Sequence, residues 1–191
     1  MQNNNKGKLF VYAGASGVGK GTIMKELLKR DDTIKLSVSA TTRNPRDGEV
    51  HGREYFFVSK EKFEEMISEN GFLEHAQYCD NYYGTPKAYV QEQLDKGYNV
   101  FLEIELQGAQ NVLKLRPDAV SIFILPPSVE ELDRRLRDRG TETEEAIVKR
   151  LSQAQVEMEN AKMYQYTVVN DDLDKAIEDV LEIVRKETGL Q

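Results

Sequence analysis

Residues 14–22 read Gly14-Ala15-Ser16-Gly17-Val18-Gly19-Lys20-Gly21-Thr22, and this stretch decides the fold of the 191-residue chain. It follows an apolar run, 9–13, that is typical of a buried strand, and it precedes a segment, 23–29, with the apolar spacing of a helix. A strand, a glycine loop, a lysine and a helix in this order predict a phosphate-binding P-loop. Glycines let backbone N–H groups converge on phosphate oxygens, and the helix N-terminus adds partial positive charge. Lys20 is expected to reach the outer phosphates as a movable charge.

The loop differs from the usual P-loop pattern at one position. Gly21 follows the lysine where Ser or Thr commonly supplies a hydroxyl to Mg²⁺. Two alternatives stay open: the hydroxyl of Thr22 binds the metal, or the metal is held through water. The phosphate-binding prediction does not depend on this choice.

The composition favours one soluble globular domain. Charged residues make up 31% of the chain, hydrophobic residues 39%, and the formal net charge is -7. This acidic balance argues against a nucleic-acid coat or a membrane-surface protein, so an anionic ligand needs locally concentrated arginines. We therefore expect no nucleic-acid partner and no membrane partner.

The terminal and cysteine patterns indicate a cytoplasmic protein. The first residues are polar and lack the apolar core of a signal peptide, and no apolar run approaches the ~20 residues that span a bilayer. The single cysteine, Cys79, excludes an intramolecular disulfide and suits a reducing compartment. The sequence leaves the oligomeric state open.

Residues 36–90 have the pattern of a small, mostly antiparallel insert. A short strand at 36–39 leads into a loop that carries Arg43 and Arg46, which form either an anion clamp or a solvated basic loop. The remaining elements are a strand at 54–58, a helix at 60–68 capped by Ser59, a strand at 72–78, a turn at 81–86 and a helix from Pro86 to Lys96.

The next strand, 99–106, begins with an apolar run and ends with alternating carboxylates. Glu103 and Glu105, two residues apart on a strand, are expected on one face at its carboxyl end, where parallel sheets bind ligands. They either contact a substrate or hydrated magnesium, or mark a strand end that reaches solvent. A further core strand is predicted at 120–125.

The C-terminal third carries arginines on helix faces that are predicted to point inward, where arginine is uncommon without a partner. Ser128 begins a capping box, and Arg135 and Arg139 share the apolar stripe of the helix that follows. A longer helix starts near Thr143 and carries Arg150 beside its stripe. These arginines either converge across a hinge at Gly140 as a lid over phosphates, or pair with local glutamates at the surface.

The chain ends with a strand at 166–169 and a helix capped by the segment 170–172, whose expected inward residues are Leu173, Ile177, Val180, Leu181 and Val184. Strands alternate with helices outside the insert, which predicts an α/β fold with a parallel core sheet flanked by helices. The P-loop, the insert and the arginine lid together favour phosphoryl transfer between two nucleotides over water-driven hydrolysis.

The chain also resembles the guanylate kinase family from about Lys8 to Glu187. The resemblance rests on the P-loop and on the segments Thr41-Thr42-Arg43 with Arg46, Gly48-Glu49-Val50, Asn81-Tyr82-Tyr83-Gly84-Thr85, Pro126-Pro127-Ser128 and Arg139-Gly140-Thr141-Glu142. It implies the nucleoside-monophosphate-kinase fold and the reversible conversion of ATP and GMP to ADP and GDP, with Mg²⁺. It also implies a domain at 8–187 with a core (8–35, 97–127 and 164–187), a GMP-binding region (36–90) and a lid (128–163).

The resemblance assigns roles to individual residues. Those implied to bind ATP are Gly14, Ala15, Ser16, Gly17, Val18, Gly19, Lys20, Gly21, Thr22, Asn170 and Asp171, and those implied to stabilise the transition state are Lys20, Arg135, Arg139 and Arg150. Those implied to bind the GMP phosphate are Arg43, Arg46, Tyr55 and Tyr83, and those implied to recognise guanine are Ser39, Glu74, Thr85 and Glu105. Three residues depart from the family pattern: Ala15 replaces a frequent proline, Gly21 replaces a common hydroxyl residue, and Glu105 replaces a more usual aspartate.

Hydrogen-bond chemistry agrees with the guanine assignment. Guanine presents N1–H and an exocyclic amine side by side, which the Glu74 carboxylate can accept together, while Thr85 can donate to O6. An adenylate kinase can share the P-loop, but adenine lacks the N1 proton and would leave that carboxylate unpaired. A non-catalytic scaffold domain related to the family is the other alternative, and the intact Lys20 and lid arginines argue against it.

Overall fold

The computed structural model describes residues 6–138, 140 and 143–189, so the predictions for Arg139, Thr141 and Glu142 lie outside the described residues. The chain divides into two compact units. Unit 1 comprises residues 1–9 and 33–119, and unit 2 comprises residues 10–32 and 120–191.

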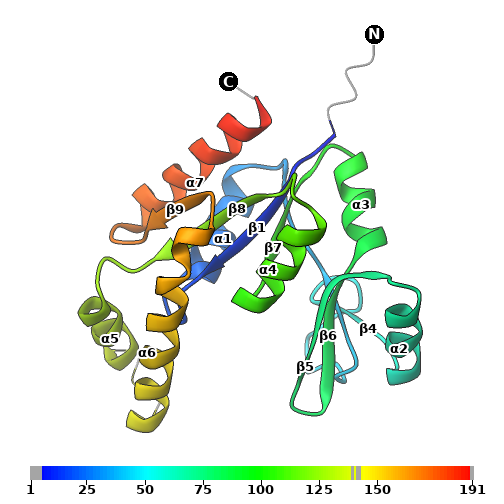
Figure 1. Ribbon diagram of the computed structural model, residues 1–191, viewed down its shortest axis with the longest axis horizontal. Helices are drawn as coiled ribbons and strands as arrows, with labels where there is room; N and C mark the ends of the chain where they lie inside the picture. Colours follow the sequence, from blue (N-terminus) through cyan, green and yellow to red (C-terminus); the bar gives the residue numbers. More distant parts are fainter. Residues whose placement is uncertain (1–5, 139, 141–142, 190–191) are drawn as a thin grey trace. The chain divides into compact units, whose positions relative to one another are not determined.

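Unit 2 is built on parallel strands. β8 (Val120–Leu125) lies between β1 (Leu9–Gly14) and β9 (Tyr166–Val169) and pairs in parallel with both. Most of β1 and β8 is buried, as expected for strands covered on both faces. α1 (Lys20–Arg30) packs against α7 (Leu173–Thr188), which also covers β9 (Figure 1).

Two further helices of unit 2 form the predicted lid region. α5 (Val129–Asp138) and α6 (Glu144–Glu159) lie side by side (Figure 1). The predicted N-caps are present, since Ser128 Oγ accepts the Glu131 N–H at 3.1 Å and Thr143 caps α6. The Glu131 carboxylate does not close the reciprocal half of the capping box; it binds Arg134 and Arg135 instead. A short 3-10 helix, Ala161–Met163, follows.

Unit 1 contains a parallel strand pair and a second sheet. β2 (Ile34–Leu36) pairs in parallel with β7 (Asn99–Glu103). The second sheet has the order β4 (Tyr55–Phe57), β3 (Ser39–Thr41), β6 (Asn81–Pro86), β5 (Phe72–Tyr78). Its β3–β6 and β5–β6 pairs are antiparallel and its β3–β4 pair is parallel, so the predicted mostly antiparallel insert is confirmed. The helices are α2 (Lys60–Ser68), α3 (Lys87–Asp95) and α4 (Leu106–Leu115).

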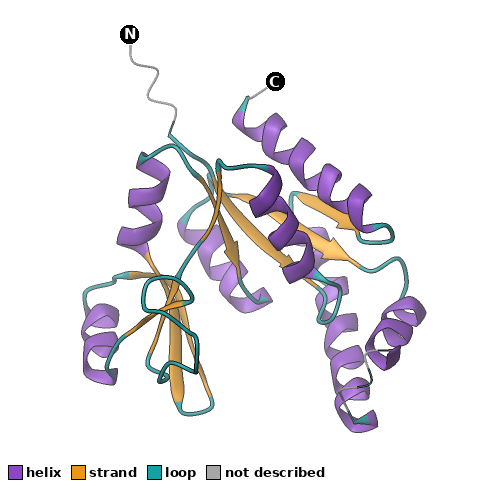
Figure 2. Ribbon diagram, turned by 180° about the vertical axis from the view of Figure 1, so that it is seen from behind, coloured by secondary structure: helices purple, strands orange, loops and turns teal. Residues whose placement is uncertain are grey.

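The second sheet has one apolar face and one polar face. Helix α2 lies beside the strands of this sheet (Figure 2). Its Phe63 is fully buried against Ala40 and Phe72, and the rings of Phe63 and Phe72 stack at 4.4 Å. Residues directly opposite on neighbouring strands share a face, and the side-chain period along a strand is two. The other face therefore carries Ser39, Thr41, Tyr55, Phe57 and Tyr83. Four of the predicted binding residues, Ser39, Tyr55, Tyr83 and Thr85, are on this polar side.

Two predicted elements of the insert are wrong. The expected strand at 36–39 is the junction between β2 and β3, because the chain leaves one sheet and enters another at Ser37 and Val38. The expected turn at 81–86 is β6, and the hairpin turn lies at Cys79 and Asp80 instead. Cys79 has a left-handed φ of 51°, which its residue type does not signal.

The prediction for 99–106 is wrong at its end, and α4 was missed. β7 stops at Glu103, and Glu105 is the N-cap residue of α4, so the two carboxylates do not share a strand. Leu173, expected inward at the start of α7, is 39% exposed, while the other four expected residues of that helix are buried. The α/β class with a parallel core flanked by helices is confirmed. Among the described residues, no helix is both long and apolar enough to cross a membrane.

Candidate functional site

The phosphate loop joins β1 to α1 and requires glycine at two left-handed positions. Gly17 and Gly19 have φ values of 86° and 95°. A Cβ at Gly17 would lie 2.7 Å from Leu136 Cδ2, and one at Gly19 would lie 2.9 Å from Asn170 Nδ2. The positive φ values therefore strain any larger residue, and an added Cβ would also require the side chain of Leu136 or Asn170 to shift.

Lys20 begins α1 and folds back over the loop. Its Nζ donates to the carbonyl oxygens of Gly14 at 2.6 Å and Ala15 at 3.2 Å. The first turn of α1 contains no acidic residue, so nothing there opposes an anion at the helix N-terminus. The lysine is thus placed at the predicted phosphate site, on acceptors that a phosphate oxygen can replace.

A second loop of unit 2 supports the phosphate loop. The buried Asn170 donates from Nδ2 to the Val18 carbonyl at 2.8 Å, and its N–H donates to Leu125 O at 2.8 Å. Arg135 donates to the carbonyls of Asn170 at 2.7 Å and Asp171 at 3.4 Å and pairs with Glu131. The structure therefore joins two predicted ATP ligands and one predicted catalytic arginine in one hydrogen-bonded support.

Helix α6 contacts the same loop. Arg150 Nε donates to Ser16 Oγ at 3.2 Å, and Glu157 Oε2 accepts the Ser16 N–H at 2.8 Å. The structure therefore places Arg150 against the phosphate loop, and its predicted role stays a prediction. Glu157 was not singled out from the sequence, because one glutamate among many on a helix carries no spacing signal.

In unit 1, an arginine and two tyrosines converge on the polar side of the second sheet. Arg43 Nη2 lies 2.9 Å from both carboxylate oxygens of Glu49, and its guanidinium lies 5.5 Å from the ring centre of Tyr55. The rings of Tyr55 and Tyr83 meet edge to face at 6.0 Å. Arg43 lowers the pKa of Glu49 by hydrogen bonding, helped by the Arg46 N–H. Arg43 is therefore paired with Glu49, which was not predicted as a site residue, whereas Arg46 is exposed.

Glu74 and Thr85 meet because of a bulge. Phe72 pairs with Pro86 and His75 with Gly84, so two residues of β5 oppose Thr85 alone on β6. Thr85 Oγ1 donates to Glu74 Oε1 at 2.6 Å. Burial raises the pKa of the Glu74 carboxyl above its ordinary 4.5; the hydrogen bond from Thr85 and the charge of His75 oppose this rise, and the charge of Glu105 adds to it. Glu74 and Thr85 therefore lie together, and the half-buried Glu74 carboxylate accepts hydrogen bonds.

Helix α4 contributes to the Glu74 environment, although the sequence reading missed it. A Cβ built on Gly108 would lie 3.3 Å from Glu74 Oε2, so this glycine lets the helix approach the carboxylate. Glu105 begins the same helix and acts on Glu74 through its charge. An isolated glycine near predicted carboxylates was the available signal, and it was overlooked.

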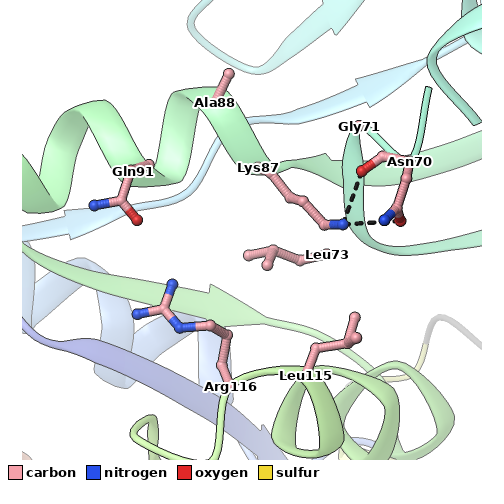
Figure 3. Close-up of a pocket in the computed structure, with 8 residues that line it drawn as sticks. All are labelled: Asn70, Gly71, Leu73, Lys87, Ala88, Gln91, Leu115 and Arg116. Carbon is pink, nitrogen blue, oxygen red and sulfur yellow. Dashed lines mark hydrogen bonds between the residues drawn. The ribbon is translucent and has the colours of Figure 1, made fainter.

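Unit 1 also has a cavity of about 510 Å³ that no predicted site residue lines. Its two cations are already bound: Lys87 donates to Asn70 O and Oδ1, as Figure 3 shows, and Arg116 pairs with Asp118. We therefore assign it no part of the candidate site. Its lining residues are Asn70, Gly71, Leu73, Lys87, Ala88, Gln91, Leu115 and Arg116 (Figure 3).

The donor set around the phosphate loop fits a magnesium ion carried by a nucleotide better than one held by a protein cage. No group of three or more His, Cys, Asp or Glu side chains suited to a metal occurs in the described part of the chain. Gly21 offers no side chain and the Thr22 residue is exposed. Mg²⁺ commonly keeps several waters and binds phosphates with one or two protein ligands.

Comparison with known proteins identifies the family of the chain. The family model described as guanylate kinase matches residues 6–187. A guanylate kinase of Clostridioides difficile is 57% identical over 182 residues, covering 95% of this chain and 89% of its own length, and one of Synechocystis is 51% identical over 186 residues, covering 97% of each. The crystal structure of guanylate kinase from Anaplasma phagocytophilum matches with a TM-score of 0.71 at 35% identity, covering 96% of this chain and 87% of that one. The chain belongs to the guanylate kinase family.

Proposed function

We propose that this chain transfers the γ-phosphoryl group of ATP to the phosphate of GMP, giving ADP and GDP. A GMP phosphate oxygen attacks the γ-phosphorus while the bond from that phosphorus to the β–γ bridging oxygen breaks, so ADP leaves with the electron pair. The proposed parts are a core (8–35, 97–127 and 164–187), a GMP-binding region (36–90) and a lid (128–163).

The donor nucleotide binds in unit 2. The proposed ATP-binding residues are Gly14, Ala15, Ser16, Gly17, Val18, Gly19, Lys20, Gly21, Thr22, Asn170 and Asp171. Lys20 exchanges its loop carbonyls for outer phosphate oxygens, and Arg135, Arg139 and Arg150 supply further positive charge as the phosphoryl group moves. The Thr22 hydroxyl, either directly or through water, would hold the Mg²⁺ that accompanies ATP, and the metal would neutralise part of the phosphate charge.

The acceptor binds in unit 1. Arg43, Arg46, Tyr55 and Tyr83 take the GMP phosphate, and Ser39, Glu74, Thr85 and Glu105 take the base. Thr85 donates to Glu74 in the present structure, so donation to guanine O6 requires its hydroxyl to rotate, while the guanine donors replace it on the carboxylate.

One observation carries the choice of acceptor: a proton-accepting carboxylate, Glu74, is half-buried on the same sheet as the Arg43 anion site. Such a site pairs fully with guanine and is left unpaired by adenine. Hydrogen-bonding sites of this kind discriminate by about 10⁴–10⁵. We also propose that the protein acts in the cytoplasm, which its one free cysteine suits.

The test compares GMP and AMP as acceptors while ADP release is measured with ATP and Mg²⁺. We expect kcat/KM for GMP to exceed that for AMP by at least about 10⁴, and Glu74→Gln to lower GMP use. A preference for AMP would contradict the base assignment. Binding of GMP without turnover of any acceptor would instead indicate a non-catalytic member of the family.

A further inference from the structure

Helix α6 grips one residue of the phosphate loop at both of its polar groups. Arg150 Nε donates to Ser16 Oγ at 3.2 Å, and Glu157 Oε2 accepts the Ser16 N–H at 2.8 Å. Seven residues separate Arg150 from Glu157, which is two helical turns, so both side chains leave α6 on one face. The peptide and the hydroxyl of Ser16 are therefore set from one helix.

The Glu157 carboxylate is itself oriented. Gln153, one turn earlier on α6, donates from Nε2 to Glu157 Oε1 at 2.9 Å. Each carboxylate oxygen thus has a donor, one from the helix and one from the loop. The side chain is half-buried, so its conformation is restricted at both ends.

A glycine-rich loop benefits from such a support, because glycine loses more conformational freedom than other residues when its backbone is fixed. Gly17 and Gly19 both lie in the left-handed region. Fixing their backbone only when the nucleotide binds would cost conformational entropy and weaken affinity, whereas a loop that is already fixed avoids this cost. Asn170 holds the second half of the loop at the Val18 carbonyl. Glu157 holds the first half at Ser16.

We propose that Glu157 is a positioning residue that acts through Ser16. It fixes the Ser16 peptide for the donor phosphates and places the Ser16 hydroxyl against Arg150. The inference rests on the proposed function, because that function makes the loop and Arg150 part of the phosphoryl-transfer machinery.

A carboxylate on a phosphate-loop N–H has a second possible role with the opposite consequence. It can stand where a phosphate oxygen binds and compete with ATP through its charge. If Glu157 positions Ser16, its effect depends on whether its side chain is long enough to bring an acceptor oxygen to the Ser16 N–H. If Glu157 competes with ATP, its effect depends on its negative charge. Variants that separate reach from charge therefore distinguish the two roles.

The experiment compares Glu157→Asp, which keeps the charge and loses reach, with Glu157→Gln, which keeps an acceptor oxygen and loses the charge. Gln153 can turn its amide to accept from the new amide of Glu157→Gln, so the orientation survives. Initial rates give kcat and KM for ATP and GMP separately. Glu159→Gln is the matched control, since Glu159 is an exposed carboxylate on the same helix.

We expect Glu157→Asp to lower kcat/KM for ATP about tenfold, the size of one lost charge-assisted hydrogen bond. Glu157→Gln should keep at least half of the wild-type kcat/KM for ATP, and the control Glu159→Gln should equal wild type. In all of these variants, KM for GMP should stay within about twofold of the wild-type value. Combining Ser16→Ala with Glu157→Asp gives less than the product of the single effects, because the hydroxyl that Glu157 places against Arg150 is absent in Ser16→Ala, while the Ser16 N–H remains.

Three results would overturn the proposal: wild-type kinetics in Glu157→Asp, an equal loss in Glu157→Gln, or a lower KM for ATP in Glu157→Gln, which identifies a competitor. Thermal unfolding of each variant shows whether a loss reflects global stability, and a loss that follows stability rather than reach also counts against it. Absence of GMP phosphorylation in the wild-type protein is a separate result that contradicts the proposed function.

Discussion

Lys20 shows how a single side chain is kept available for a ligand. Its ammonium group rests on two backbone carbonyls of its own loop, at 2.6 Å and 3.2 Å, and no acidic side chain occupies the first turn of its helix. Exchange of neutral carbonyls for phosphate oxygens is favourable because the new acceptors are charged. The lysine is therefore held at the loop by neutral carbonyl acceptors that phosphate oxygens can replace.

We expect Lys20→Ala to lower kcat by about 10²–10³-fold, because one donor that stabilises developing charge is lost. Circular dichroism and thermal unfolding should stay close to wild type, since the Lys20 ammonium group binds backbone carbonyls of the loop. Lys25→Ala, a change at an exposed lysine of the same helix, is the control. Full activity in Lys20→Ala would contradict the assigned role.

Glu74 predicts a pH dependence specific to the acceptor. Burial raises its pKa above 4.5, and guanine recognition requires the ionised carboxylate. As the pH falls towards this raised pKa, KM for GMP should rise at a pH where an ordinary glutamate is still ionised. Measurement of KM for ATP over the same range is the control, and parallel changes in both would speak against Glu74 as the cause.

The same shift has a consequence for stability. A carboxyl whose folded pKa lies above its unfolded value contributes stability that is present below the unfolded pKa and is lost as the pH rises through the folded pKa. Glu74→Gln cannot ionise, so it avoids this loss of folding stability, and its amide oxygen can still accept a hydrogen bond from the Thr85 hydroxyl. Its thermal midpoint should therefore exceed that of wild type by more at pH 8 than at pH 4. An equal difference at both values would show that ionisation of Glu74 does not oppose folding.

Among the helices, α4 approaches the carboxylate that is proposed to recognise the base. Its N-cap is Glu105, and Gly108 brings the helix against Glu74. Glycine inside a helix destabilises it by about 1 kcal/mol relative to alanine, so this position exchanges helix stability for proximity.

We expect Gly108→Ala to leave the thermal midpoint unchanged or higher and to raise KM for GMP several-fold, while KM for ATP stays constant. The new methyl group would lie 3.3 Å from Glu74 Oε2 and must displace the end of that side chain. Gln107→Ala, on the exposed side of the same turn, is the control. Unchanged GMP kinetics in Gly108→Ala would show that the carboxylate tolerates the crowding.

At the level of the entire chain, the two half-sites belong to different compact units. The proposed acceptor residues lie within 33–119, and the proposed donor residues lie within 10–32 and 120–191. Each substrate alone should therefore stabilise its own unit first, because binding free energy stabilises only the folded state that the ligand contacts.

Hydrogen exchange can test this division. GMP alone should slow exchange mainly in β3, β5 and β6, and ADP alone should slow it mainly at 14–22 and 170–171. Uniform protection of both units by either nucleotide would contradict the assignment of one ligand to each. Denatured protein exchanged under the same conditions gives the reference rate.

Local chemistry made much of this protein predictable. Continuous apolar runs predicted β1 and β8, because strands covered on both faces are apolar along most of their length. Ser59, Ser128 and Thr143 marked helix starts because their hydroxyls accept hydrogen bonds from free N–H groups. The phosphate loop was readable because left-handed backbone and close approach both demand glycine. The predicted site residues came from the family resemblance together with this chemistry, and their roles stay predictions.

Only the tertiary structure decided the rest. Pro86 and Gly84 read as a turn, yet pairing with β3 and β5 made them part of β6, since a strand partner outweighs local propensity. The bulge that joins Glu74 to Thr85, the approach of Gly108 and the grip of Glu157 on Ser16 all connect residues distant in the chain. A sequence specifies local conformation through neighbouring residues, but such contacts depend on register and packing, which exist only once the chain has folded.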